Sequence, residues 1–153
     1  MLDVWLWGLI HAATGYLSHR LPRRMLDHDA WLWRERRIEG GGSLYTRRLH
    51  VRRWQRHLPE AGDLFAGGYD KRHLGGRSTA ALTNYLQETR RAEVAHWLAL
   101  ACAPSFLLFN PLSADILLML YALASNGPCI ASLRYNRIRL SRVMARRTAR
   151  AAR

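Results

Sequence analysis

Apolar residues gather in three runs along the chain, and short polar segments separate them. The runs cover residues 2–17, 97–109 and 116–133. Each run is long enough for several helical turns, so we expect three apolar helices. The second and third runs are separated by residues 110–113, Asn-Pro-Leu-Ser, which is a turn signal. Residues 97–133 are therefore predicted to form a helical hairpin. A Gly-Pro pair at 127–128 interrupts its second arm, where we expect a kink.

The segment before the hairpin predicts a long helix. Ser78 or Thr79 is a suitable N-cap for a helix that begins near Ala80. No helix breaker follows until Pro104, so this helix is expected to continue into the second apolar run and to end near Cys102.

Residues 47–58 have the pattern of an amphipathic helix. Val51, Trp54 and Leu58 share one face, and arginines occupy much of the rest. Tryptophan and arginine at this density favour a helix that lies on an anionic lipid surface. The glycine-rich residues 40–42 and 60–68 are predicted to be loops that separate the helical pieces.

Charge is segregated in the same pattern. The chain has 24 basic and 11 acidic residues, a net charge of +13, yet residues 1–17 and 97–133 contain no Arg or Lys. Apolar segments with basic flanks are typical of proteins embedded in a bilayer, whereas a soluble bundle usually carries charge along every surface helix. Buried helices of a soluble bundle remain the alternative. A nucleic-acid binder would explain the positive charge. It would not explain the 37 consecutive residues without Arg or Lys at 97–133, so we expect no nucleic-acid partner.

These patterns predict an all-α fold: a small integral membrane helical bundle with amphipathic interfacial helices on the cytoplasmic side. The whole chain, 1–153, is expected to form one membrane domain. Its parts are an N-terminal apolar helix at 2–17, cytoplasmic or interfacial helices at 18–96, a membrane hairpin at 97–133 and a basic cytoplasmic tail at 134–153. The basic flanks predict that residues 18–96 and the tail lie on the cytoplasmic side of the cell membrane. The charge rule does not decide whether the hairpin spans the bilayer or is re-entrant.

Glu93 and His96 are the first candidates for catalytic chemistry. They lie three residues apart, so a carboxylate and an imidazole can meet on one helix face just before Trp97. The carboxylate would fix the tautomer of the ring, which suits a general base acting on a hydroxyl. The competing interpretation is a structural polar pair. A di-iron site would need a second Glu-x-x-His motif and further glutamates, and we expect no metal.

Two further clusters follow the same logic. Asp70 and His73 form a competing acid/base pair directly after a Gly-Gly turn. Arg134, Asn136 and Arg137 follow the last apolar run, where a plain basic anchor is the alternative. Guanidinium groups at this position can bind the phosphates of a coenzyme or a lipid headgroup.

The chain resembles the glycosyl-4,4'-diaponeurosporenoate acyltransferase family of bacterial carotenoid synthesis. The resemblance covers about residues 45–142, while the first forty residues match only in character. It rests on the strings Val51-Arg-Arg-Trp54, Tyr69-Asp-Lys-Arg-His-Leu74, Glu88-Thr-Arg-Arg-Ala-Glu93, His96-Trp97, Phe109-Asn110, Arg134-Tyr-Asn-Arg137 and Arg139-Leu140.

The resemblance implies a membrane enzyme that esterifies a sugar hydroxyl of a glycosylated carotenoid, or a similar glycolipid, with a fatty acyl group. We expect no bound cofactor, an acyl thioester as co-substrate, and membrane lipids, the glycolipid acceptor and the acyl donor as partners. The oligomeric state stays open. The alternative function is a non-catalytic membrane adaptor that binds a partner protein or anionic lipid through its basic surface. The residues expected to bind substrate or donor are Arg72, Glu88, Arg91, Arg134, Asn136 and Arg137.

Overall fold

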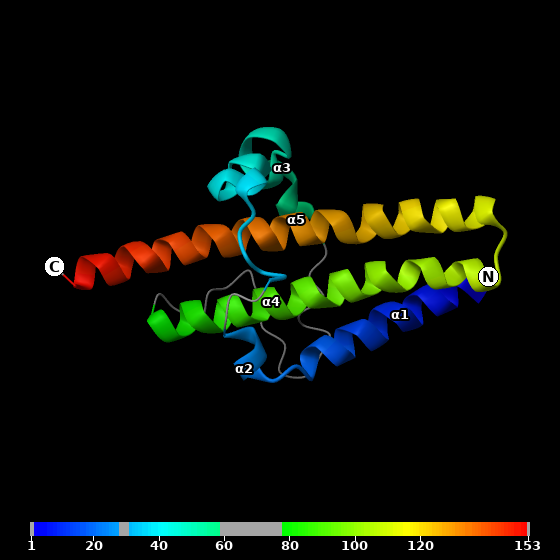
Figure 1. The fold of residues 1–153 in the computed structure, drawn as a ribbon, viewed down its shortest axis with the longest axis horizontal. Helices are drawn as coiled ribbons and strands as arrows, with labels where there is room; N and C mark the ends of the chain where they lie inside the picture. The colour runs from blue at the N-terminus through cyan, green and yellow to red at the C-terminus, as the bar shows by residue number, and fades with distance from the viewer. Residues whose placement is uncertain (1, 28–30, 59–77, 153) are drawn as a thin grey trace.

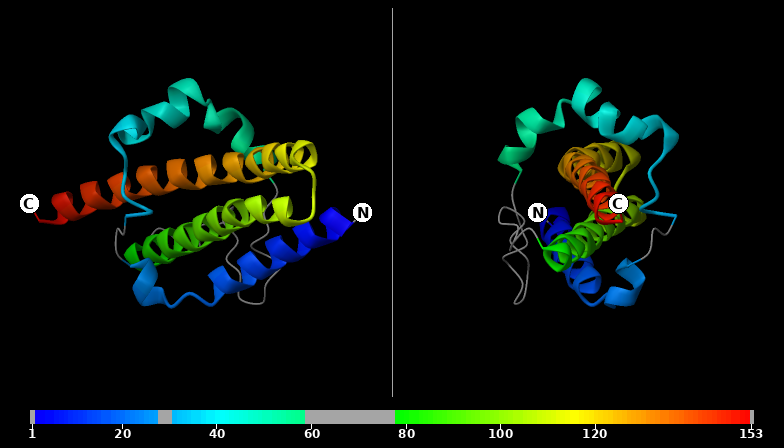
Figure 2. Two further views of the ribbon diagram at one scale, coloured as in Figure 1. Left: turned by 45° about the vertical axis from the view of Figure 1, so that its right-hand side comes forward. Right: turned by 90° about the vertical axis from the view of Figure 1, so that its left-hand side faces the viewer.

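The computed structural model describes residues 2–27, 31–58 and 78–152 (Figure 1). Every regular element within these ranges is helical. Three long helices, α1 (Leu2–His19), α4 (Thr79–Cys102) and α5 (Leu112–Ala151), lie side by side, with α4 between the other two (Figures 1 and 2). The prediction of an all-α protein is confirmed.

The predicted hairpin is present. The side chain of Ser78 caps α4 by accepting a hydrogen bond from the Ala81 amide at 3.2 Å, and α4 ends at Cys102, as expected. A short 3₁₀ helix, η5 (Ala103–Leu108), and a turn then reverse the chain into α5. At this end Asn110 donates a hydrogen bond to Asp3 at 3.0 Å, which holds the start of α1 beside the hairpin turn.

Helix α5 continues well past the predicted apolar run. Pro128 lies inside it, and the backbone stays helical on both sides of the proline. The predicted basic tail is not a separate segment, because residues 134–151 form the last turns of α5. Forty residues at 1.5 Å per residue make a helix of about 60 Å, roughly twice the hydrocarbon thickness of a bilayer.

The described part of the chain between α1 and α4 packs against α4 through its first short helix and against α5 through the other four. It contains the short helices α2 (Arg23–Leu26), η1 (Arg37–Gly42), η2 (Leu44–Arg48), α3 (Val51–Trp54) and η3 (Gln55–His57). The prediction of a single amphipathic helix at 47–58 is therefore wrong, because η2, α3 and η3 share this region. It is broken at His50, whose positive φ of 48° interrupts regular helix geometry.

The apolar residues expected to face lipid at 47–58 pack against α5 instead. Val51 is fully buried and packs with Tyr45 against Tyr135 and Ile138 of α5, with Trp54 alongside. The glycine-rich turn before it needs its glycines, since Gly40, Gly41 and Gly42 all have positive φ.

Large apolar side chains are exposed at the end of the bundle that holds the hairpin turn. A small cluster of Trp7, Ala103, Phe106 and Ala122 forms the core there. Among the described helices, α5 alone is long and apolar enough to cross a membrane, and only 28% of its most apolar window is buried. Exposed apolar surface of this extent fits membrane association. The exposed residues at this end include Leu2, Val4, Trp5, Leu9, Leu107, Leu108, Phe109, Leu112, Ile116, Leu117, Leu120 and Leu123.

Candidate active site

A buried ion-pair network joins α4 to α5 midway along the bundle. Arg134 and Arg137 lie three residues apart on α5, so both guanidinium groups project from one face. Glu93, fully buried on α4, accepts from Arg134 Nη1 at 2.8 Å and from Arg137 Nη2 at 3.1 Å. The indole of Trp97 donates to the same carboxylate at 3.3 Å.

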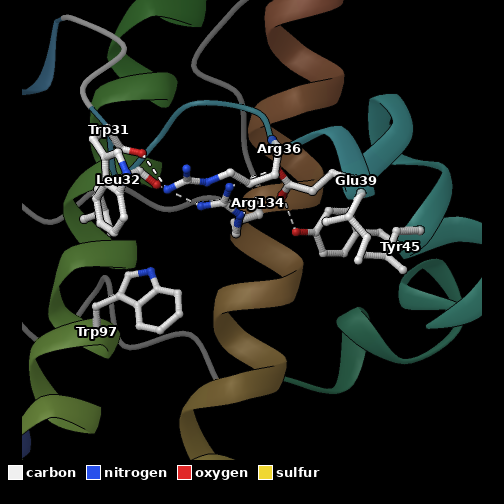
Figure 3. A pocket seen from close by; sticks show the side chains of 9 residues that line it. Trp31, Leu32, Arg36, Glu39, Tyr45, Trp97 and Arg134 are labelled. Carbon is white, nitrogen blue, oxygen red and sulfur yellow. Dashed lines mark hydrogen bonds and ion pairs between the residues drawn. The ribbon is translucent and has the colours of Figure 1, made fainter.

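A second carboxylate completes the network. It comes from residues 31–58, which pack across α5 and are called the crossing segment below. Glu39 is buried and accepts two hydrogen bonds from Arg134, at 2.7 and 2.9 Å. The Tyr45 hydroxyl donates to Glu39 at 2.5 Å, and the Arg36 amide donates as well (Figure 3). Two carboxylates thus balance two guanidinium groups. This balance offsets part of the large cost of burying four charges.

The same arginines hold the segment at residues 32–34 against the helices. Arg134 donates to the carbonyl oxygens of Leu32 at 2.9 Å and Arg34 at 3.2 Å, and Arg137 donates to that of Trp33. One guanidinium therefore binds α4, the crossing segment and its backbone together. Arg137 Nε is buried and has no hydrogen-bond partner among the described residues.

His96 lies one helical turn beyond Glu93, toward the apolar end. Its Nδ1 lies 2.9 Å from Oδ1 of Asn126, a fully buried residue of α5. The amide orientation of Asn126 follows from its other contacts, because Nδ2 donates to Ala122 O at 3.0 Å and to Ser125 Oγ at 3.2 Å. Since Oδ1 can only accept, Nδ1 of His96 carries a proton.

The structure brings together some of the predicted site residues. Glu93, Arg134 and Arg137 meet, and Asn136 lies between the two arginines on α5, half-buried. Glu93 was predicted to orient the His96 ring. In the structure its carboxylate binds Arg134 and Arg137, and Asn126 contacts the ring.

Arg91 and Glu88 are placed differently from the predicted donor site. They contact each other at 3.3 Å, and Arg91 donates to the carbonyl oxygens of Ser18 at 3.0 Å, His19 and Leu21 at 3.2 Å. These carbonyl oxygens lie at the end of α1 and just beyond it, so the contact joins α4 to the end of α1. Asp70, Arg72 and His73 lie outside the described residues, so their proposed roles stay predictions.

Sequence reasoning missed Glu39, Tyr45 and Asn126. A buried arginine needs an acidic partner, and this need was the signal that could have pointed to Glu39. The spacing of residues along the chain, however, does not say which acid it is. Asn126 directly precedes the Gly-Pro pair expected to kink the helix, and the signal for it is that a lone amide in an apolar run is unusual.

The pKa of Glu39 gives the network a measurable pH dependence. Burial by itself would raise this pKa, but hydrogen bonds from Arg134, Arg36 and Tyr45 and the charge of Arg134 lower it from 4.5 to about 2. A depressed pKa stabilises the fold above the unfolded value, and that contribution is lost as the pH falls through the folded value. We therefore expect stability to decline between pH 4.5 and about 2.

The measurement is chemical unfolding in detergent, followed by tryptophan fluorescence from pH 6 to pH 2. Glu39→Gln should be less stable than the parent at pH 6 and should show a smaller decline over that window. Parallel pH profiles for the two proteins would contradict the assignment.

Taken together, the all-helical fold, the exposed apolar end and the buried polar site describe a helical protein of the membrane-associated class. The family model of glycosyl-4,4'-diaponeurosporenoate acyltransferase matches residues 29–146, and the chain belongs to this family. The protein is accordingly an acyltransferase.

Individual relatives agree with the family match. Glycosyl-4,4'-diaponeurosporenoate acyltransferases of Staphylococcus aureus strains USA300 and NCTC 8325 are each 28% identical to the chain over 140 residues, covering 90% of this chain and 83% of theirs. The protein of strain Newman is 26% identical over the same extent. No solved structure matches the chain.

Proposed function

We propose that this acyltransferase esterifies a sugar hydroxyl of a glycosylated carotenoid, or of a similar glycolipid, with a fatty acyl group taken from a thioester. Family membership supports the reaction class and the acceptor, because the relatives are named for a glycosyl diaponeurosporenoate. The observation that carries the mechanism is the His96–Asn126 pair, a polar dyad between two helices at the edge of the apolar end. Ionisable groups in such surroundings are costly and are often functional.

His96 acts as the general base in this proposal. Asn126 keeps the proton on Nδ1, so Nε2 accepts the proton of the sugar hydroxyl as its oxygen attacks the thioester carbonyl. The new carbon–oxygen bond forms, the carbon–sulfur bond breaks, and His96 returns the proton to the leaving thiolate. Asp70 and His73 remain the competing acid/base pair.

The buried arginines bind Glu93, one turn of α4 before His96, and support this chemistry from there. The Arg137 Nε–H group is a donor of the type that an oxyanion accepts, and it has no other partner among the described residues. Arg134 acts by positioning, since its nitrogens bind Glu39, Glu93 and backbone carbonyls. We keep donor binding by Arg91, Glu88, Arg72 and Asn136 as a prediction only.

We further propose that the protein lies in the cell membrane with the site toward the cytoplasm. The start of α1 and the hairpin turn lie at the apolar end, and the arginine-rich C-terminal part of α5 extends to the other end (Figure 1). The rule that basic segments stay in the cytoplasm supports this orientation.

A non-catalytic membrane adaptor is the second candidate. The exposed arginines of η2, α3 and η3 favour it, since five of them lie within ten residues: Arg47, Arg48, Arg52, Arg53 and Arg56. An adaptor can scatter its polar groups, however, and here Glu93, Arg134 and Arg137 converge in one buried network.

The test is lipid mass spectrometry in a bacterial host that accumulates glycosyl-4,4'-diaponeurosporenoate. Carbonate-washed membranes with the protein should form an acyl ester of the glycoside, and membranes from the empty-vector host should not. Washing removes proteins that are bound only by charge, so retained activity also tests membrane embedding. Abundant, membrane-bound protein without any new ester would favour the adaptor.

A further inference from the structure

A cavity of about 420 Å³ lies between the crossing segment and the two long helices (Figure 3). This volume is within the range of small-molecule sites. Trp97 comes from α4, Arg134 from α5, and the other lining residues from the segment at 31–45. The lining residues are Trp31, Leu32, Arg36, Ile38, Glu39, Leu44, Tyr45, Trp97 and Arg134.

The cavity has apolar walls and a polar side on which Glu39 is paired with Arg134. Trp31, Ile38 and Leu44 line it from one segment, and Trp97 lines it from α4. Both carboxylate oxygens of Glu39 accept hydrogen bonds from Arg134. A ligand therefore needs no charge of its own to compensate the Glu39 carboxylate, and the apolar walls favour a hydrocarbon.

Apolar side chains at the cavity are also left in contact with solvent. Trp31 is 75% exposed, Ile38 is 77% exposed and Trp97 is 39% exposed. Arg36 stacks on the Trp31 ring at 4.6 Å and donates from Nη2 to the Trp31 carbonyl at 3.0 Å. A guanidinium has five N–H donors, so Arg36 has donors left for a carbonyl oxygen of a ligand.

We infer that this cavity binds the hydrocarbon chain of the fatty acyl donor, with the polar end of the chain near Arg36. The inference rests on the acyl transfer proposed above. A flexible acyl chain can bend into a compact cavity of this volume, whereas a conjugated polyene is stiff and would need a long straight channel. The polyene of the acceptor instead has the exposed apolar surface of α1 and α5 to lie on.

The first experiment measures the preference for acyl-chain length. Leu44→Trp adds bulk to the wall, so kcat/KM for long-chain donors should fall about 10-fold or more, while short-chain donors are used nearly as well as by the parent. Leu49→Trp is the matched control, since Leu49 is exposed and does not line the cavity. An unchanged chain-length profile in an active Leu44→Trp enzyme would overturn the inference.

The second experiment detects binding without turnover. A fatty acid carrying a photoactivatable diazirine is irradiated with the purified full-length protein in detergent, and labelled peptides are identified by mass spectrometry. We expect labels on residues 31–45 and on the peptide with Trp97, and a loss of these labels in Leu44→Trp. Labels confined to α1 and the apolar half of α5, or labels displaced by the carotenoid glycoside rather than by fatty acid, would overturn the inference.

The two experiments separate failure of the inference from failure of the proposed function. Labelling of the cavity in a protein that forms no ester would leave the binding site in place and reject the transferase reaction. Ester formation with label elsewhere would reject the cavity and retain the reaction.

Discussion

Replacing His96 with alanine should lower acyl transfer by about 10²–10⁴-fold, the usual contribution of a general base. The loss should appear in kcat, because the imidazole acts on the reacting hydroxyl, and the protein should still be made and inserted. The measurement is ester formation per amount of membrane-bound protein. His96 is only partly buried and contacts Asn126 through Nδ1, so a small effect on stability is expected.

Two variants separate catalysis from structure. His57→Ala removes an exposed histidine of η3 and should leave the rate unchanged. Asn126→Ala should lower activity by less than His96→Ala, because the base remains but its tautomer is no longer held. A well-expressed His96→Ala protein with near-normal transfer would contradict the role of His96 and make His73, with Asp70, the leading base.

Replacing Glu93 with glutamine should lower the free energy of unfolding by about 3–5 kcal/mol. The fully buried carboxylate accepts from both Arg134 and Arg137, so its neutralisation leaves an uncompensated positive charge in the interior. We expect low abundance, a lower melting temperature in detergent and a parallel loss of activity. Thermal unfolding of the purified protein, followed by intrinsic fluorescence, provides the measurement.

Glu35→Gln is the matched control for this prediction. Glu35 is exposed and lies 3.6 Å from exposed Arg142, and surface pairs contribute about 0–1 kcal/mol. The double variant Glu93→Gln with Arg137→Gln should be less destabilised than the sum of its two single variants, because it removes one charge of each sign. A Glu93→Gln protein as stable as the Glu35→Gln control would show that the buried network is not needed for the fold.

Local patterns were sufficient for the three long helices and their order. The Ser78 cap, the continuation of α4 to Cys102 and the turn before α5 follow from capping chemistry and from the positions of prolines. The apolar end follows from the segregation of charge, because a segment without cations must bury its surface in protein or lipid. The family was likewise readable in the sequence, since its strings are short, local and rich in charged and aromatic residues.

The partners of the polar residues were decided by the tertiary structure. Spacing paired Glu93 with His96, but a buried carboxylate is stabilised most by charge-assisted bonds, and Arg134 and Arg137 provide them from 41 and 44 residues away. Asn126, 30 residues from His96, contacts the ring in its place. The crossing segment likewise contributes Glu39 and the cavity walls only because the two arginines bind its carbonyl oxygens. Such long-range pairs depend on which helix faces meet, and no periodicity within one segment records that choice.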